Sequence, residues 1–149
     1  MTLDVHGLSG FLKHVRVLGP AREQTQVELS PSEALAIGVT APVRLSEDTV
    51  RAGGCILKSK HAEIRISSCI IVPARHLHLS EQTAIELHVQ QGQIVAVECL
   101  SEPFTRVDHV TVRVHPTFSN ELHLTSDEVA EYWLHESDLF KLCDIISSS

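Results

Sequence analysis

Short runs in which apolar and polar residues alternate dominate the chain, and turn residues separate them at close intervals. Along residues 25–29 the valine and the leucine fall on one face, and Gln26 and Glu28 fall on the other. This two-residue period predicts a half-buried strand. Residues 69–72 are continuously apolar, which favours a strand buried on both faces. Further strands are expected over residues 14–17, 42–45, 55–58, 62–66, 93–100, 110–114 and 121–124.

Three helices of one or two turns are expected between these strands. Each follows a serine or threonine whose hydroxyl can accept a hydrogen bond from a backbone amide of the first helical turn. The expected helices cover residues 33–37, 81–87 and 127–134, after Ser30 or Ser32, Ser80, and Thr125 or Ser126. Short strands with such helices between them predict a mainly β fold of two small antiparallel β-barrels with short capped helices.

The order strand, turn, strand, cap and helix occurs twice, which indicates an internal repeat. Residues 15–34 and 112–129 share the aliphatic strands, the caps and the acidic first turn of the helix. Glu28 and His123 occupy equivalent positions in the two copies. A strand over residues 76–78 precedes the second copy but has no counterpart before the first, so the first barrel is expected to be incomplete. The predicted organisation is a leader over residues 1–13, a partial first barrel over 14–69, and a second barrel with a C-terminal tail over 70–149.

Composition and charge narrow the classes of function. Apolar residues make up 43 % of the 149 residues and charged residues 21 %, which are the proportions of a globular protein with a real core. A net charge of −7 without a run of lysine or arginine argues against nucleic acid as a partner. No apolar run approaches the ~20 residues of a membrane span, and residues 1–10 do not resemble a secretory signal. A cytoplasmic protein without a membrane partner is therefore expected.

The four cysteines lack the spacing of a paired metal or redox motif. They are Cys55, Cys69, Cys99 and Cys143. Free thiols are expected in a cytosolic protein. The apolar strand contexts of Cys55 and Cys69 also disfavour a thiol nucleophile.

The ten histidines are unusual for a chain of this size, and some have the spacing of metal ligands. His76 and His78 lie two apart on an expected strand, so their rings project from one face, roughly 6.5–7 Å apart along it. Catalytic zinc sites use three protein ligands and leave one position open. His123, on a strand of the second repeat, is the candidate third ligand. The alternative is that the two neighbouring histidines form a polar strand face in solvent.

Two residues of the first repeat are further candidates. Glu28, the counterpart of His123, would ligate a second metal by symmetry, although the matching pair of histidines is absent; the alternative is an exposed strand carboxylate. Arg22 follows the turn over residues 19–21, where a guanidinium can bind phosphate through two hydrogen bonds. A solvated turn arginine is the alternative for Arg22.

Together these segments resemble the PduL family, the phosphate propanoyltransferases of bacterial propanediol metabolism. Residues 15–22 with 25–28 resemble the first signature of the family, and residues 35–43 resemble the helix and strand that follow it. The sequence ARHLHLS at residues 74–80 resembles the second histidine motif. Residues 112–114, 122–124 and 127–128 resemble the last motif, so the likeness runs in order from about residue 14 to residue 130.

The resemblance implies two antiparallel β-barrels with short helices and a dinuclear zinc site between them. It also implies a zinc-dependent transfer of an acyl group, such as propanoyl, between coenzyme A and phosphate. It implies zinc ligands at Glu28, His76, His78 and His123. It implies an essential arginine at Arg22 and coenzyme A contacts at Arg16, Leu18 and His123. A homo-oligomer, within a bacterial microcompartment or in contact with its proteins, is also implied.

Two departures from the family pattern leave the function open. The N-terminal histidine motif that supplies ligands for the first zinc ion has no counterpart here, and Ala130 stands where the family usually has an asparagine. The chain is therefore expected to be either an acyltransferase of reduced activity or a non-catalytic zinc-binding relative that acts as a partner. The same departures also fit a fragment of a longer gene product, and a metal-dependent hydrolase would use the same histidines.

Overall fold

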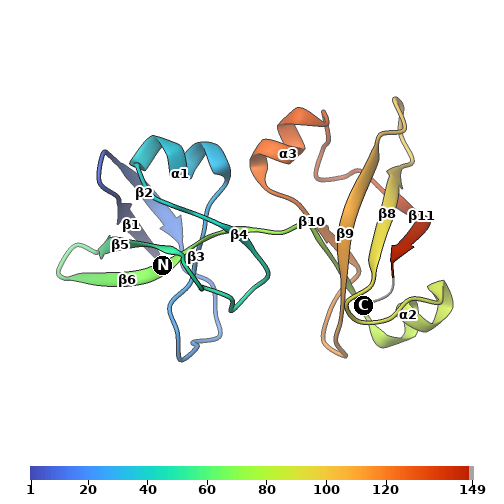
Figure 1. The fold of residues 1–149 in the computed structure, drawn as a ribbon, viewed down its shortest axis with the longest axis horizontal. Helices are drawn as coiled ribbons and strands as arrows, with labels where there is room; N and C mark the ends of the chain where they lie inside the picture. Colours follow the sequence, from blue (N-terminus) through green and yellow to red (C-terminus); the bar gives the residue numbers. More distant parts are fainter. Residues whose placement is uncertain (148–149) are drawn as a thin grey trace. The chain divides into compact units, whose positions relative to one another are not determined.

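Strand β6 (Glu63–Pro73) is the longest element of the first of two units into which the chain divides, Met1–Pro73 and Ala74–Ser149. The structure is a computed structural model that describes residues 1–147. Each unit is built mainly from strands (Figure 1). Residues 62–66 and 69–72, expected as two strands, belong almost entirely to β6. The apolar part of this strand is buried, as its sequence predicted.

Five shorter strands complete the sheet of the first unit. They are β1 (Thr2–His6), β2 (Phe11–Arg16), β3 (Val27–Glu28), β4 (Val43–Arg44) and β5 (Gly53–Lys58). The strand order is β2, β1, β5, β6, β3, and β4 also pairs with β6. The pairings of β3 and β4 with β6 are parallel, whereas the others are antiparallel. Helix α1 (Pro31–Ile37) buries Ala34 and Ile37 in the core of this unit.

The hairpin of β1 and β2 occupies the segment expected as a leader. Val5 on β1 is 1 % exposed and packs into the core of the first unit. A Cβ on Gly7 would lie 2.2 Å from the carbonyl oxygen of Ile37. The lack of a side chain at Gly7 therefore lets the hairpin turn approach the end of α1. Residues 1–13 belong to the first unit, which ends at Pro73, a few residues beyond the expected boundary.

The second unit has a five-stranded sheet. Its strands are β7 (His76–Leu79), β8 (Ile94–Cys99), β9 (Arg106–Val114), β10 (Glu121–His123) and β11 (Phe140–Ser147). The strand order is β10, β7, β9, β8, β11, in which only the pairing of β7 with β9 is parallel. The most deeply buried side chains of this core are Leu79, Val95, Val97, Val107, Val110 and Val112.

Strand β11 lies in the segment expected as the C-terminal tail of the second barrel. Phe140 and Leu142 pack against the core of the second unit while the strand pairs with β8. The register shifts between Leu142 and Asp144 and again beyond Ile145. Because each shift breaks the two-residue alternation, the sequence of this segment did not show a strand period.

The helices begin where the sequence placed their caps. Helix α1 starts after Ser30, α2 (Glu81–Leu87) after Ser80 and α3 (Ser126–Glu131) after Thr125. Helix α3 ends before its expected limit at residue 134. The predicted fold class is confirmed for the described residues: a mainly β chain with short capped helices and incomplete barrels, in which a few strand pairs are parallel. None of the helices in residues 1–147 combines the length and apolarity needed to cross a membrane.

Candidate metal centre

Three of the four candidate ligands stand at one kind of position, two residues before the N-cap of a helix, with a leucine between; His76 is the exception. These triplets are Glu28-Leu29-Ser30, His78-Leu79-Ser80 and His123-Leu124-Thr125. Successive strand residues point to opposite faces, so the leucine enters the core and the ligand candidate faces away from it. Leu29 is 3 % exposed and Leu79 is 2 % exposed, in agreement with this arrangement.

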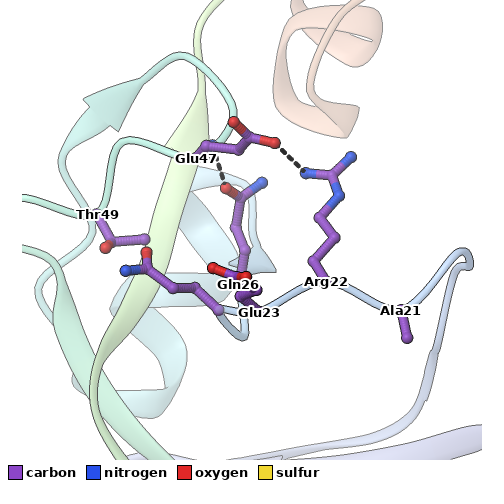
Figure 2. A pocket seen from close by; sticks show the side chains of 7 residues that line it. Ala21, Arg22, Glu23, Gln26, Glu47 and Thr49 are labelled. Atoms are coloured by element: carbon purple, nitrogen blue, oxygen red, sulfur yellow. Dashed lines mark hydrogen bonds and ion pairs between the residues drawn. The ribbon is translucent and has the colours of Figure 1, made fainter.

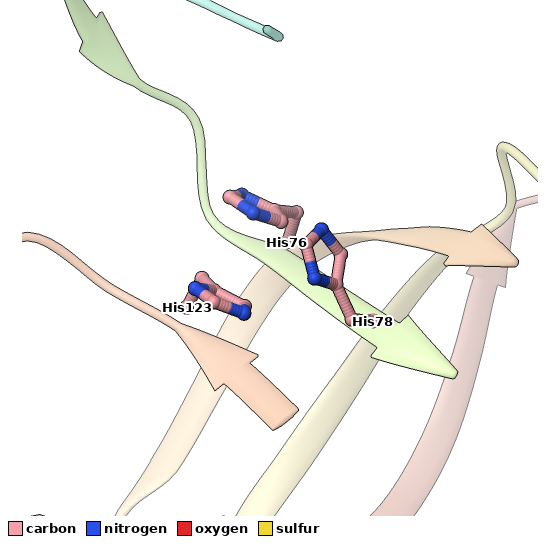
Figure 3. A group of neighbouring side chains, drawn as sticks. All are labelled: His76, His78 and His123. Atoms are coloured by element: carbon pink, nitrogen blue, oxygen red, sulfur yellow. The ribbon is translucent and has the colours of Figure 1, made fainter. Parts of the chain in front are cut away.

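Pairing of β7 with β10 brings three histidines together on one face of the second unit. The two strands are antiparallel, and His76 lies directly opposite His123. The centroids of these two rings are 4.7 Å apart, and the rings are nearly parallel. The His78 ring lies 4.3 Å from the His123 ring (Figure 3). One ring nitrogen of each histidine lies within 4.8 Å of the other two, so that one ion could contact all three.

A backbone carbonyl orients the His76 ring. Nδ1 of His76 lies 2.8 Å from the carbonyl oxygen of Ala74. A neutral imidazole that donates from Nδ1 presents Nε2 as its acceptor, and such an outer hydrogen bond commonly accompanies metal-ligating histidines.

Burial keeps the His78 ring neutral. Its pKa is lowered to about 4, first by burial and then by repulsion from His123, His76 and Arg113. The ring of Phe118 stacks on that of His78, with centroids 3.9 Å apart. At neutral pH His78 therefore has the unprotonated form that a metal requires.

The Nε2 atom of His123 is the least satisfied polar atom of the cluster. The atom is buried and has no hydrogen-bond partner among the described residues, although the side chain as a whole is 38 % exposed. An oxygen of Glu121 lies 3.3 Å away, but this contact lacks hydrogen-bond geometry. Buried polar atoms nearly always have a partner, so a bound ion would explain this nitrogen. Three imidazoles are a donor set that zinc favours, so the residues present fit a zinc ion.

The sequence did not predict a set of polar contacts made by Arg75, next to the three histidines, which we call the Arg75 clamp. Arg75, which precedes His76, pairs with the Glu128 carboxylate through Nε. Its other nitrogens donate to the Asp108 carbonyl and the Tyr132 hydroxyl, both at 2.8 Å. Because Glu128 also closes the capping box of α3, the clamp joins the start of β7 to that helix. The partners lie 53 and 57 residues from Arg75 in the sequence, so only the folded topology reveals them.

The remaining predicted site residues lie in the first unit, where hydrogen bonds through Gln26 and Ser46 link Glu28 to Arg22. The exposed carboxylate of Glu28 accepts a hydrogen bond of 2.9 Å from Gln26. Arg16 and Leu18 are exposed. Arg22 borders a cavity of about 560 Å³ together with Ala21, Glu23, Gln24, Gln26, Glu47 and Thr49 (Figure 2). Its guanidinium donates to the Ser46 hydroxyl at 3.0 Å and lies 3.8 Å from Glu47.

The cysteines are free thiols, as the sequence predicted. The sulfur atoms of Cys55 and Cys69, on neighbouring strands, are 3.5 Å apart. The hydrogen bond between these thiols, together with burial, raises the pKa of Cys69. The same hydrogen bond lowers the pKa of Cys55. Both thiols are nevertheless buried in the core of the first unit, which makes them inert toward a substrate.

Comparisons with known proteins give a consistent result. A family model described as phosphate propanoyltransferase matches residues 1–134. A phosphate propanoyltransferase of Escherichia fergusonii is 41 % identical over 128 residues, which cover 85 % of this chain and 61 % of that protein. Proteins of the same name from Citrobacter rodentium and Shewanella putrefaciens are each 40 % identical with the same coverage. The chain thus spans less than two thirds of the length of these relatives.

Proposed function

The chain belongs to the phosphate propanoyltransferase family, and on this premise we propose that it catalyses transfer of a short acyl group between coenzyme A and phosphate. The observation that carries the proposal is the three-histidine cluster of the second unit, with its buried and unsatisfied His123 nitrogen. Propanoyl is the acyl group that the family name indicates.

In this proposal His76, His78 and His123 hold one zinc ion through their imidazole nitrogens. A zinc ion bound there would supply a Lewis acid for the thioester carbonyl or for phosphate. The Ala74 carbonyl sets which nitrogen of His76 faces the ion. The Phe118 ring covers one face of His78 and limits access of water to it.

In this proposal the remaining predicted residues bind the two substrates. Arg22 neutralises charge on phosphate, for which its guanidinium would have to leave Ser46 and Glu47. Arg16, Leu18 and His123 contact coenzyme A. A phosphate oxygen forms a bond to the thioester carbon, the carbon–sulfur bond breaks, and coenzyme A departs with the electron pair. Both substrates are held by the protein, so proximity supplies much of the rate and no protein nucleophile is needed.

One zinc ion per chain is the stoichiometry that we propose. Among residues 1–147 no second group of three metal-ligating side chains lies within metal-binding distance. Glu28, the ligand that the family resemblance implies for a second ion, is an exposed carboxylate bonded to Gln26. This hydrogen-bonded, exposed Glu28 favours one competing function, that of a non-catalytic zinc-binding relative that acts as a partner in an oligomer or a microcompartment in the cytoplasm.

The decisive experiment measures release of coenzyme A thiol from propanoyl-CoA by the zinc-loaded protein, with and without phosphate. We expect release that requires phosphate and is lost in His76→Ala. The matched control is His61→Ala, which removes an exposed histidine of the first unit. Equal release without phosphate would identify a hydrolase. Bound zinc without release of coenzyme A would establish the non-catalytic function.

A further inference from the structure

Strand β10 presents a fourth polar side chain on the face that carries the histidines. Glu121 lies directly opposite His78 in the β7–β10 pair, just as His123 lies opposite His76. Because residues two apart on a strand share a face, Glu121 and His123 point to the same side of β10. Four chemically active side chains therefore occupy two cross-strand pairs on one face, on either side of the Leu122–Leu77 pair.

The distance between Glu121 and His123 is that of two ligands of one ion. Glu121 does not belong to the group whose ligand atoms all lie within 4.8 Å of one another, so its carboxylate must swing toward the other two histidines to share the ion. Oε2 of Glu121 lies 3.3 Å from Nε2 of His123. Nitrogen and oxygen ligands bind zinc at about 2.0–2.2 Å, and two such ligands at the tetrahedral angle lie about 3.3–3.5 Å apart. A hydrogen bond between the same atoms would account for the distance too, but the contact does not have that geometry.

The charge of a bound zinc ion also favours a carboxylate as the fourth ligand. Three neutral imidazoles leave the double charge of a zinc ion uncompensated, and a carboxylate halves it. Glu121 makes no other ion pair within the described part of the chain. Its side chain is 59 % exposed, so the carboxylate can move without repacking the core.

We propose that Glu121 is the fourth ligand of the zinc site and yields its place when substrate binds. This inference rests on the three-histidine site of the proposed function. The resting site is then closed by four protein ligands, and it opens only when an anionic or carbonyl oxygen displaces the carboxylate. A carboxylate on an exposed edge strand suits such an exchange better than a buried imidazole.

Three variants test the assignment through metal affinity rather than turnover. Glu121→Ala removes the carboxylate, and Glu121→Asp keeps its charge but withdraws it by about 1.5 Å, the length of one carbon–carbon bond. Glu86→Ala is the control, because it removes an equal charge from the exposed face of α2 in the same unit. Zinc affinity is measured by competition with a chromophoric chelator, and the cobalt-substituted proteins are compared by visible absorption. Thermal unfolding without metal shows that each variant is folded.

We expect both Glu121 variants to bind zinc at least about tenfold more weakly than the unaltered protein, and Glu86→Ala to bind it equally well. The visible bands of cobalt should change in both Glu121 variants. Wild-type affinity and spectrum in Glu121→Asp would overturn the proposal, since nearby charge alone would then explain any loss in Glu121→Ala. If the unaltered protein binds no zinc, the histidine site fails and the fourth ligand fails with it. If it binds zinc and all three variants match it, only the role of Glu121 is refuted.

Discussion

The three imidazole rings of the second unit are held by different contacts. His76 is oriented by the Ala74 carbonyl, and His78 is stacked against Phe118. His123 is placed by the pairing of β10 with β7 and keeps a buried nitrogen without a hydrogen-bond partner. Leaving such a nitrogen unsatisfied costs about 1–3 kcal/mol, which binding of a metal ion would offset. Each ring therefore has its own structural reason for its position.

Substitution of single histidines tests the ligand set at this scale. The native protein should contain about one zinc ion per chain by elemental analysis, because three imidazoles converge at one point. His76→Ala and His123→Ala should each lose most of the metal, since an incomplete set of imidazole ligands binds zinc far more weakly than the full set. His61→Ala should retain it. Full zinc retention in both cluster variants would refute the assignment.

At the scale of elements, the contact that joins β7 to α3 is the Arg75 clamp. Arg75 bonds to Glu128, to the Asp108 carbonyl and to Tyr132, so one side chain links a strand, its neighbour β9 and a helix. The side chains of Arg75 and Glu128 are 26 % and 17 % exposed, which reduces competition from water. The clamp fixes the residue next to His76, so it sets where the strand that carries two ligands begins.

Arg75→Gln should therefore weaken both the fold and the metal site. Loss of charged hydrogen bonds to half-buried partners should lower the free energy of unfolding by about 1–3 kcal/mol. Urea unfolding of the metal-free protein measures this loss, and chelator competition measures zinc affinity. Lys58→Gln, which removes an exposed pair with Glu63 in the first unit, is the control and should change neither quantity appreciably. Equal stability of Arg75→Gln and the unaltered protein would show that the clamp contributes little.

The elements that the sequence predicted are those set by local rules. Serine and threonine caps gave the helix starts, and the buried run at residues 69–72 gave the core of β6. The β1–β2 hairpin was not predicted because the reason for it is a tertiary contact: Gly7 is needed where the turn meets α1. Strand β11 was not predicted because its register shifts interrupt the two-residue alternation of apolar and polar residues. The sequence does show that Glu121 lies two residues before His123 and so shares its face of the strand. Only the pairing register shows which histidine Glu121 faces.

At the scale of the whole chain, zinc should act on one unit and leave the other unchanged. The three histidines come from β7 and β10, and β10 is a three-residue strand at the edge of its sheet. An ion held by both strands would cross-link this weak edge. At a free zinc concentration of 100 times Kd, the stabilisation would be about 2.7 kcal/mol. No metal-ligand cluster exists in the described residues of the first unit, so its stability should not respond.

Hydrogen exchange of the native protein, compared with and without zinc, measures this difference. Amides of β7 and β10 should exchange about 100-fold more slowly with zinc at that concentration, if they open only when the metal leaves. Amides of β5 and β6 should exchange at the same rate in both conditions. The control is His76→Ala, in which added zinc should protect neither unit because the ion has lost a ligand. Protection of β5 and β6 to the same extent as β7 and β10 would contradict the prediction, because it would require metal binding that involves the first unit. Such a result would direct attention to Glu28 as a ligand, since it occupies in the first unit the place that His123 occupies in the second.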